Sequence, residues 1–394
     1  MKEGWEYKTL GEVCKIYNGN SINADYKKKH FLGATGGLPF IATKDVSPLG
    51  TIDYNNGVRI PNYEEYKVAP ANSVFICAEG GSAGKKFAYV EKDVCFGNKL
   101  FCITPKDKAI KGKFIYHFVQ SDNFRGQFFS LLTGLIGGVS AKKFQTIEIP
   151  VPSLSEQQSI VDYLDSAFAK IDAMKANAEK ALNEAKALFQ ASLKEMLEPK
   201  EGWEEKKLHE VAYDFSRGKS KHRPRNDKKL FGGKYPFIQT GEIRNANVYV
   251  TSHSSTYNEI GLSQSKLWPK DTVCITIAAN IAEVAILKYP SCFPDSVIGF
   301  VADNNKADKL FVFYSLLKYQ QELKKQGKGS AQDNINLGTF EKNYFPFPSL
   351  EEQQSIVTTL DSLKSKVDRL QENYDKISQE CDALKQAILR QVFE

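Results

Sequence analysis

The feature that most constrains the fold of this 394-residue chain is an internal repeat. Three blocks recur: EGWEYKTLGEV at 3–13 and EGWEEKKLHEV at 201–211, LPFIATKDV at 38–46 and YPFIQTGEI at 235–243, and PVPSLSEQQSIVDYLDS at 150–166 and PFPSLEEQQSIVTTLDS at 346–362. The offset between copies stays between 196 and 198 residues. Because it hardly drifts, the two halves are predicted to share one fold with only small insertions.

Each half is predicted to end in a long helix. Residues 153–198 and 349–394 contain no Gly and no Pro and are rich in Ala, Leu, Glu, Gln and Lys, a composition typical of helices. A Ser followed three residues later by Glu, at Ser153 and at Ser349, is the spacing of an N-terminal capping box. The predicted organisation is a globular domain at 1–152, a helix at 153–199, a second domain at 200–348 and a second helix at 349–394.

Apolar residues recur at spacings of three and four along both helices. They are Val161, Leu164, Phe168, Ile171, Ala178, Leu182, Ala185, Phe189 and Met196 in the first, and Ile356, Leu360, Leu363, Val367, Leu370, Tyr374, Ile377, Cys381, Leu384 and Ile388 in the second. Such a seam over four or more heptads is typical of a coiled coil, most simply between these two helices. Because only residues 199–202 join the first helix to the second domain, the pair is predicted to be antiparallel, with one domain flanking each end.

The two globular parts contain short apolar or alternating runs rich in β-branched and aromatic residues, which predict strands. A short helix is expected in each, at 111–129 and at 309–327, where apolar residues recur at three and four. The predicted fold class is therefore α+β: an internal two-fold repeat of two mostly-β or mixed domains, separated by two long helices that form an antiparallel coiled coil.

Positive charge is concentrated in the globular parts. Residues 1–149 hold 20 Lys and Arg against 14 Asp and Glu, and residues 201–345 hold 21 against 16. The helical segments carry a net negative charge, although the whole chain is only +6. Two basic domains joined by acidic helices indicate a polyanion that is contacted at two places.

Basic residues gather in one loop that follows the same early strand in each half, at 18–30 and at 216–229. The candidate DNA-binding residues there are Asn18, Asn20, Ser21, Lys27 and Lys28, and Arg217, Lys219, Lys221, Arg223 and Arg225. Arg, Lys, Asn and Gln read base edges, whereas Lys near a phosphate positions the protein. A solvated loop is the alternative. Further candidates are Lys44 in the strand block at 38–46, Thr240 in its copy at 235–243, and Arg244 directly after that copy.

Two further loops are candidates for phosphate or base contact. The segment AEGGSAGKK at 78–86, with Ser82, Lys85 and Lys86, lacks the first Gly and the Ser or Thr of a nucleotide-binding P-loop, but its backbone suits a DNA phosphate. Asn280 lies in the matching segment. Ahead of the helices, Lys142 and Lys143 in one half match Gln332, Asn334 and Asn336 in the other. Turn formation by Asn is an equal alternative there.

No catalytic constellation is found in the sequence. The five histidines are scattered, no Pro-Pro motif occurs, and the seven cysteines lack C-x-x-C spacing and are expected to be buried thiols. Asp295 with Asp303, or the run at 227–229 that begins with Asp227, could supply carboxylates for a nuclease metal site. Their spacing fits such a site only loosely, and they occur in only one half. We predict no catalytic residue, metal or cofactor. With a charged start and no long apolar segment, a cytoplasmic protein without membrane contact is expected.

The repeated P-x-P-S-L-x-E-Q-Q-S-I-V block, the repeated G-W-E-x-K-x-L-x-E-V block and the P-F-I strand resemble the specificity subunits of type I restriction-modification systems. The resemblance covers essentially the whole chain. It implies two target recognition domains that each read half of a bipartite, asymmetric site in double-stranded DNA. It also implies helices that set the spacer and dock two methyltransferase subunits, which use S-adenosylmethionine, with restriction and translocase subunits joining the complex.

The resemblance also implies that the repeated EQQ blocks belong to the shared scaffold and docking surface. These residues are Glu156, Gln157, Gln158, Glu352, Gln353 and Gln354. Two other hypotheses are kept. A duplicated coiled-coil adaptor would bind protein or RNA partners without DNA sequence specificity, and an enzyme of unrecognised type would need acid-base or nucleophilic residues that do not recur between the halves.

Overall fold

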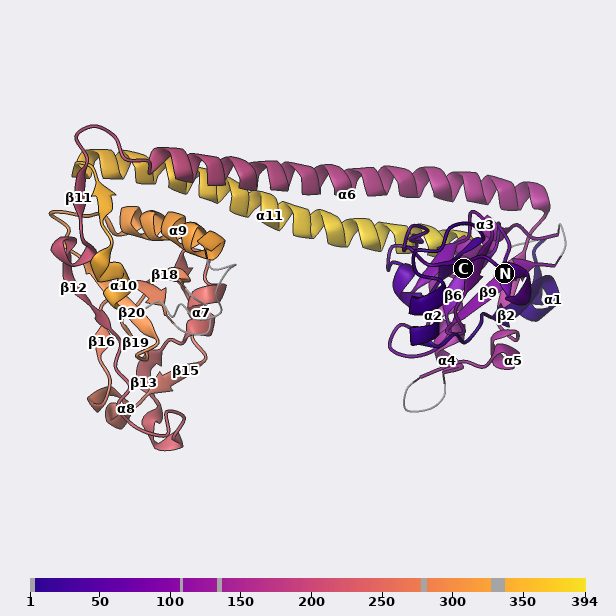
Figure 1. Cartoon of the computed structure of the whole chain (residues 1–394), viewed down its shortest axis with the longest axis horizontal. Helices are drawn as coiled ribbons and strands as arrows, with labels where there is room; N and C mark the ends of the chain where they lie inside the picture. The colour runs from indigo at the N-terminus through magenta and orange to yellow at the C-terminus, as the bar shows by residue number, and fades with distance from the viewer. Residues whose placement is uncertain (1–3, 107–108, 133–136, 278–281, 327–336) are drawn as a thin grey trace. The chain divides into compact units, whose positions relative to one another are not determined.

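The computed structural model describes residues 4–106, 109–132, 137–277, 282–326 and 337–394. The chain divides into two compact units (Figure 1). One comprises residues 1–179 and 373–394, and the other comprises residues 180–372. Each unit therefore contains one globular domain and a portion of both long helices. Among the helices of the described residues, none has a stretch apolar and long enough to cross a membrane.

The first domain is built on two four-stranded sheets and a short two-stranded ribbon. Its elements are β1 (Glu6–Thr9), α1 (Leu10–Val13), β2 (Cys14–Asn18), α2 (Ala24–His30), β3 (Leu38–Ile41), η1 (Thr43–Asp45), β4 (Arg59–Ile60), η2 (Tyr63–Glu65), β5 (Val68–Ala69), β6 (Val74–Cys77), β7 (Phe87–Tyr89), β8 (Val94–Phe96), β9 (Leu100–Pro105), α3 (Gly112–Phe118), α4 (Asp122–Ser130), α5 (Ala141–Phe144) and β10 (Glu148–Val151). The sheets have the strand orders β2-β9-β6-β7 and β4-β3-β8-β5, and β1 pairs with β10.

The second domain has the same plan. Its elements are β11 (Glu204–Lys206), η3 (Leu208–Val211), β12 (Ala212–Arg217), η4 (Lys228–Leu230), β13 (Phe231–Phe237), α7 (Thr240–Asn245), β14 (Tyr249–Val250), β15 (Ser255–Tyr257), α8 (Glu259–Ser263), β16 (Leu267–Trp268), β17 (Val273–Thr276), β18 (Val284–Leu287), β19 (Ser291–Cys292), β20 (Val297–Ala302), α9 (Lys309–Gln326), α10 (Leu337–Lys342) and β21 (Phe345–Phe347). The sheets have the orders β12-β20-β17-β18-β14 and β15-β13-β19-β16, and β11 pairs with β21.

The predicted repeat is thus confirmed strand by strand. Strands β12, β20, β17 and β18 occupy the places of β2, β9, β6 and β7, and β13 pairs in parallel with β19 as β3 does with β8. The added strand β14 pairs in parallel with β18 at the edge of the second domain's larger sheet. The predicted α+β class with mostly-β cores is correct for both domains.

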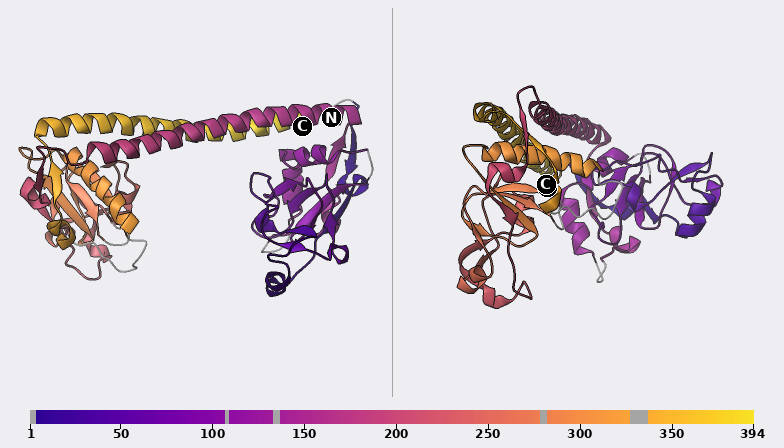
Figure 2. Two further views of the ribbon diagram at one scale, coloured as in Figure 1. Left: turned by 45° about the horizontal axis from the view of Figure 1, so that its top comes forward. Right: turned by 60° about the vertical axis from the view of Figure 1, so that its left-hand side comes forward.

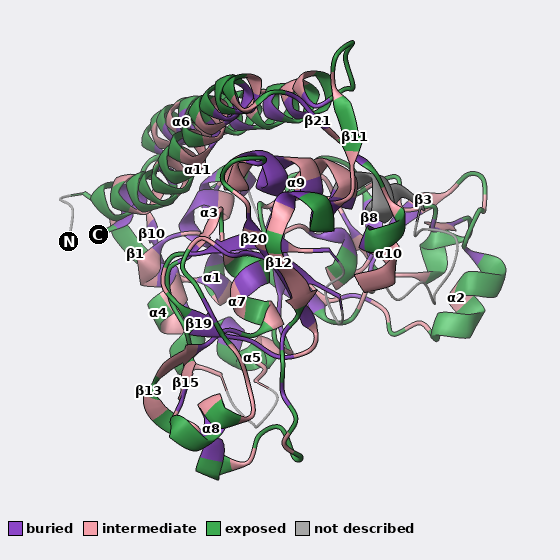
Figure 3. Cartoon of the chain, turned by 90° about the vertical axis from the view of Figure 1, so that its left-hand side faces the viewer, coloured by how far each residue is buried: buried purple, intermediate pink, exposed green. Residues whose placement is uncertain are grey.

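Central strands are apolar on both faces because each sheet separates two hydrophobic clusters. In β6, Val74 and Ile76 pack into the cluster shared with the helices, whereas Phe75 and Cys77 pack on the opposite face. Alternate side chains of a strand point to opposite faces, so burial on both sides requires an unbroken apolar run. Figure 3 shows the buried strands inside each domain. All seven cysteines are buried free thiols, as the sequence predicts.

The helix expected within residues 111–129 is divided into two, α3 and α4. Ser121 starts the second helix, since its hydroxyl accepts a hydrogen bond from the Phe124 N–H at 3.2 Å. A Ser that caps a new helix interrupts the old one, because a cap residue takes extended rather than helical backbone angles. In the second domain α9 runs unbroken from Lys309 to Gln326.

The long helices α6 (Leu154–Met196) and α11 (Leu350–Phe393) pair side by side within each unit (Figure 2). In the first unit Lys385 bonds Asp172 at 2.6 Å and Lys175 approaches Asp382 at 3.3 Å, so residue numbers rise along one helix as they fall along the other. In the second unit Lys186 donates to Gln371 at 2.7 Å. The predicted antiparallel coiled coil is correct.

The predicted apolar seam is wrong at Leu384, which is 48% exposed. The last turns of α11 pack on the first domain as well as on α6, so Leu389 and Phe393 are buried in its place. The Phe393 ring contacts Phe114 and Phe118 edge-on. A heptad pattern describes only helix-to-helix packing, and it fails where a globular surface becomes the partner.

Candidate nucleic-acid interface

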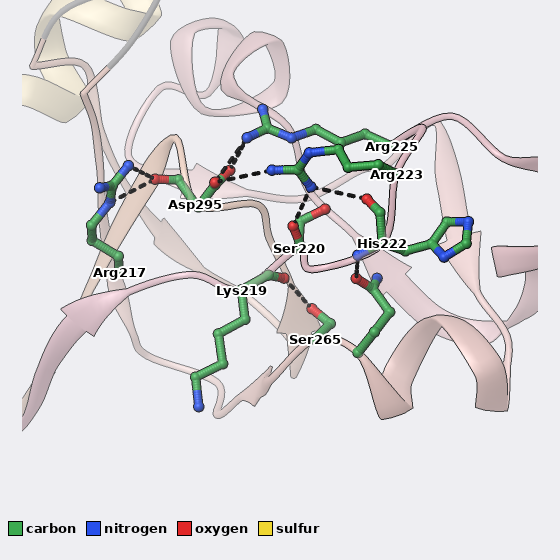
Figure 4. Close-up of polar contacts among 9 residues, drawn as sticks. Arg217, Lys219, Ser220, His222, Arg223, Arg225, Ser265 and Asp295 are labelled. Carbon is green, nitrogen blue, oxygen red and sulfur yellow. Dashed lines mark hydrogen bonds and ion pairs between the residues drawn. The ribbon is translucent and has the colours of Figure 1, made fainter.

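An arginine loop, residues 217–225, follows β12 and is organised around Asp295 (Figure 4). Arg217 donates from Nε and Nη2 to the Asp295 carbonyl oxygen at 2.9 and 2.7 Å. Arg225 Nη2 donates to the Asp295 Oδ2 at 2.8 Å and lies 2.7 Å from Oδ1. Oδ1 is shielded from solvent and not aligned for a hydrogen bond, so that second contact is an ion pair. Asp295 thus contacts Arg217 through its backbone and Arg225 through its carboxylate.

The middle of the arginine loop is held by backbone contacts. Arg223 Nη1 donates to the carbonyl oxygens of Ser220 and His222 at 2.6 and 2.9 Å, and its Nη2 lies 3.8 Å from Asp295. The His222 N–H donates to Gln264 at 3.0 Å. The charged side chains nevertheless point outward: Arg217, Lys219, Lys221, Arg223 and Arg225 are all exposed. This geometry suits contacts with an anionic surface.

Both domains need glycine where this loop leaves the sheet. A Cβ on Gly218 would lie 2.4 Å from the Pro294 carbonyl oxygen, and one on Gly19 would lie 2.0 Å from the Phe96 carbonyl oxygen. Only glycine permits such a close backbone approach. The loop is therefore packed in the same way in each domain, against the connection between β8 and β9 in the first and between β19 and β20 in the second.

In the first domain the matching loop is held by amides. Asn18 Nδ2 donates to the Asn98 carbonyl oxygen at 3.1 Å, and the Asn20 side chain accepts the Lys67 N–H at 2.7 Å. Ser21 is exposed and precedes α2, a short helix with no buried residue. Lys28 in α2 is exposed, whereas Lys27 is half-buried with its ammonium 5.1 Å from the centre of the Phe40 ring.

The other candidates of the first domain are brought close to this loop by backbone contacts. The Gly97 N–H donates to Ile41, two residues before Thr43, whose carbonyl accepts Lys86 Nζ at 3.1 Å. The Ala78–Lys86 segment in turn holds residues 137–139, because the Val139 N–H donates to Ala78 at 3.1 Å. The remaining candidates on these segments are Lys44, Lys85, Lys142 and Lys143, which are exposed, and Ser82, which is half-buried.

In the second domain Thr240 and Arg244 lie on α7, the first half-buried and the second exposed. They follow β13, whose end is joined to the β19 strand by the hydrogen bond from the Ile238 N–H to Cys292 at 2.8 Å. The Ile277 N–H donates to Ser296, beside Asp295. Four of the predicted residues, Asn280, Gln332, Asn334 and Asn336, lie outside the described residues.

The EQQ blocks place one fully buried glutamine at the start of each long helix. Gln157 donates to the carbonyl oxygens of Ala109 and Pro152, both at 2.9 Å, and accepts the Lys111 N–H at 2.9 Å. Gln353 repeats the arrangement with Lys306, Pro348 and Asp308 at 3.1, 3.0 and 2.8 Å. Each side chain binds the first turn of a helix to a loop of its domain.

The neighbouring residues of the EQQ blocks face outward. Gln158 and Gln354 are exposed, and Glu352 is half-buried. Glu156 accepts a hydrogen bond from the Trp5 indole at 2.8 Å, which connects the repeated GW motif to the helix. The capping hydroxyls of Ser153 and Ser349 accept the Glu156 and Glu352 N–H groups, both at 3.3 Å. Gln158 and Gln354 thus present their side chains to solvent, where Gln157 and Gln353 do not.

A second pair of matched positions holds each domain to its own stretch of helix. Buried His117 in α3 contacts Asp165 of α6 at 2.8 Å, and Tyr314 in α9 donates to Asp361 of α11 at 2.5 Å. The hydrogen bond from His117 lowers the pKa of Asp165 to about 2, and Lys113 adds to the effect. Burial, followed by the hydrogen bond to Asp361, raises the pKa of Tyr314 above its usual value.

Asp165→Asn is expected to lower the stability of the chain at neutral pH, and the deficit should shrink as the pH falls from about 4 to about 2. The folded-state pKa lies below the unfolded value of 3.8, so the carboxylate stabilises the fold above that value and stops doing so as it is protonated. Denaturant midpoints measured across this range test the prediction. Asp162→Asn, which removes an exposed acid bonded to Gln158, is the control. A deficit independent of pH would contradict it.

The structure gathers no catalytic cluster around the acids considered for a nuclease site. Asp295 is engaged by arginines, and Asp303 lies 3.3 Å from Lys306. Within the described ranges, no three His, Cys, Asp or Glu side chains lie close enough together to hold a metal ion. The chemistry that the interface supports in these ranges is recognition of a polyanion through guanidinium, ammonium and amide groups.

Sequence reasoning did not find the role of Asp295, nor that of Asn98 at the matching turn. Both follow an apolar strand in a turn, and nothing in their local sequence distinguishes them from other turn residues. One signal that could have found them is that both residues lie at the same distance from the repeated blocks. The strand pairing, which aligns Asn18 with Phe101 and Arg217 with Ile298, must be known as well. That alignment places the two turns opposite the two loops.

The sequence matches a known family along most of its length. Residues 2–184 and 200–379 each match the type I restriction modification DNA specificity domain. Because the two matches together cover far more than half of the chain, it belongs to this family. The two matched segments correspond to the two halves of the repeat.

Individual relatives agree with this assignment. The chain is 23% identical to the type I restriction enzyme StySPI specificity subunit of Salmonella potsdam, across 100% of this chain and 89% of the relative. Its fold is similar to that of a chain from a type I R-M system structure, with a TM-score of 0.77 at 20% identity and coverage of 100% and 98%. The HsdS subunit from Thermoanaerobacter tengcongensis superposes with a TM-score of 0.59 at 21% identity, with coverage of 100% and 97%.

Proposed function

We propose that this chain is the DNA sequence-specificity subunit of a type I restriction-modification complex. Each globular domain reads one half of a bipartite, asymmetric site in double-stranded DNA, and the paired helices set the spacer. The observation that carries the proposal is that one fold occurs twice with different polar side chains at the same loop: amides in the first domain and arginines in the second. Two readers on one scaffold require this combination of a shared framework and distinct contact residues.

The partners follow from the proposal. The outward-facing parts of the helices dock two methyltransferase subunits, and restriction and translocase subunits complete the complex. The chain itself is non-catalytic and holds no cofactor, and S-adenosylmethionine binds the methyltransferase partner. A protein that acts on chromosomal DNA in this way works in the cytoplasm.

Sequencing of N6-methyladenine in the source genome, with the gene present and deleted, tests the proposed function. Loss of one bipartite, asymmetric motif on deletion is the expected result, and it supplies both half-sites at once. An unchanged methylome in a strain that expresses the chain and its methyltransferase partner would refute the proposal. The adaptor hypothesis predicts that unchanged result, but it gives no reason for arginines held at the surface of a loop.

Arg217→Ala and Arg223→Ala are each expected to weaken recognition of one half-site only. A well-placed arginine contact to a base pair contributes about 1–3 kcal/mol of discrimination, so methylation at the motif should fall about tenfold or more, or spread to related sequences. Lys28→Ala is the matched control, since it removes an exposed cation from the other domain. Changes in the same half-site for Arg223→Ala and Lys28→Ala would contradict the assignment of loops to half-sites.

A further inference from the structure

The turn between β19 and β20 carries an acidic residue in the middle of a basic surface. Asp295 lies within 4 Å of the guanidinium groups of Arg223 and Arg225, and its own carbonyl oxygen accepts both donors of Arg217. Placing a carboxylate where the proposed ligand is a polyanion lowers the local positive charge. The carboxylate of Asp295 therefore weakens the attraction of this surface for DNA.

The fold itself does not require an acid at this position. In the first domain Asn98 occupies the matching turn, and its backbone carbonyl accepts Asn18 just as the Asp295 carbonyl accepts Arg217. The backbone contact between loop and turn is therefore common to both domains. The carboxylate is found where the loop carries arginines, and the neutral amide where the loop carries asparagines.

The carboxylate fixes long side chains that would otherwise be mobile. Arg225 is held through Nη2 alone, and 49% of its side chain stays exposed, so the rest of its guanidinium faces outward. Arg223 is braced by two carbonyl oxygens on Nη1 and by Asp295 near Nη2. A guanidinium has five N–H donors, so it can bond an internal acid along one edge and present the other to a base or phosphate.

We propose that Asp295 is a positioning residue for base recognition: it holds Arg223 and Arg225 in the orientation that discriminates the second half-site. The inference rests on the proposed DNA-reading function. Ordering the two arginines before DNA arrives reduces the entropy lost on binding and favours the base sequence that fits the fixed geometry. Asp295 thereby increases specificity while it reduces attraction to DNA of any sequence.

The test is the methylome of the intact complex in its host, with the wild-type chain or with Asp295→Asn. Sites that differ by one base in the second half-site should become methylated in the variant, with discrimination reduced about tenfold, while the first half-site stays unchanged. Glu259→Gln is the matched control. It removes one carboxylate from the same domain, near Lys234 and Tyr235, and should leave both half-sites unchanged.

Three further measurements separate positioning from a loss of folding or of charge. Arg225→Lys keeps the cation but lacks the planar guanidinium, which contacts Asp295 through Nη2 and leaves its other donors free, so it should relax the same half-site. Binding of the purified full chain to a random-sequence duplex should be stronger for Asp295→Asn than for wild type, since a negative charge has been removed. In an Arg223→Ala, Arg225→Ala background, Asp295→Asn should cause no further change in half-site discrimination.

The outcomes distinguish this inference from the proposed function. If the wild-type chain directs no motif, the DNA-reading function itself is refuted. If the wild-type motif is present but Asp295→Asn discriminates the second half-site as well as wild type does, only the role of Asp295 is refuted. Should Asp295→Asn not fold, the same result for Arg225→Lys refutes that role. Equal relaxation of both half-sites would also overturn it, because Asp295 contacts only the loop of one domain.

Discussion

Deleting residues 172–178 together with 379–385 is expected to shorten the spacer of the recognised DNA site by about 3 bp. These heptads pair in the first unit, where Asp172 contacts Lys385 and Lys175 contacts Asp382. A helix rises about 1.5 Å per residue, so seven residues remove about 10 Å, against about 3.4 Å per base pair. Removing a whole heptad from both helices preserves the seam, since Leu182 and Ile388 take the places of Lys175 and Cys381.

The measurement is the methylome of a strain that carries the double deletion in place of the wild-type gene. Both half-sites should keep their bases, because the recognition loops are untouched, and only the number of bases between them should change. Deletion of 172–178 alone is the control: it leaves Lys385 and Asp382 without their partners and should abolish methylation. A double deletion that methylates the original motif with its original spacer would show that helix length does not set the distance.

Gln157→Ala and Gln353→Ala are expected to destabilise the chain by about 3 kcal/mol each. Each glutamine is fully buried and makes three hydrogen bonds to backbone groups. Truncation leaves two carbonyl oxygens and one N–H without their partner, and a buried polar group that loses its hydrogen bond costs about 1–3 kcal/mol. The effect of each variant should be confined to the domain that contains it.

Chemical unfolding of the purified chain measures this effect, and the adjacent glutamines provide the control. Gln158 is exposed and bonds only along its own helix, to Asp162 at 2.7 Å, so Gln158→Ala should change stability by less than about 0.5 kcal/mol. Gln354→Ala is the same control for the second unit. Equal losses for Gln157→Ala and Gln158→Ala would rule out burial and the bonds to the domain loop as the cause.

Much of the fold could be predicted because its signals are local or periodic. The repeated blocks identify two copies of one fold, and Ser153 and Ser349 mark the helix starts within one residue of α6 and α11. Capping depends on contacts within one turn, so the sequence suffices for it. The apolar spacing of three and four residues likewise predicts that the two helices pair. The short connection after the first helix predicts that they run antiparallel.

The predictions that failed were overturned by contacts that the periodic pattern does not describe. Leu384 fits the heptad pattern but is exposed, because Leu389 and Phe393 pack on the first domain. The single helix expected at 111–129 is two, because Ser121 caps a new one. In both places the local pattern was compatible with the prediction, and the side chains of other elements or a competing cap decided the outcome.

The candidate interface was predictable as a set of loops but not as an arrangement. Basic composition indicated residues 18–30 and 216–229, and the structure joins the first of these to Lys44, Lys86 and the segment before α5 by hydrogen bonds between loops. Which guanidinium bonds which acceptor depends on strand register and on the turn that contains Asp295. Register is set by pairing over the whole sheet, which no single segment contains.

The sequence alone determined that the chain is a duplicated α+β protein, with two basic domains and two long helices that pair with each other, because repetition, charge and periodicity are properties of the linear chain. Only the tertiary structure decided that Gln157 and Gln353 are buried inside the scaffold, and that an aspartate contacts the arginines of the second domain. Burial and hydrogen-bond partners are properties of residues brought together from distant parts of the chain, as Gln353 is with Lys306 and Arg225 with Asp295.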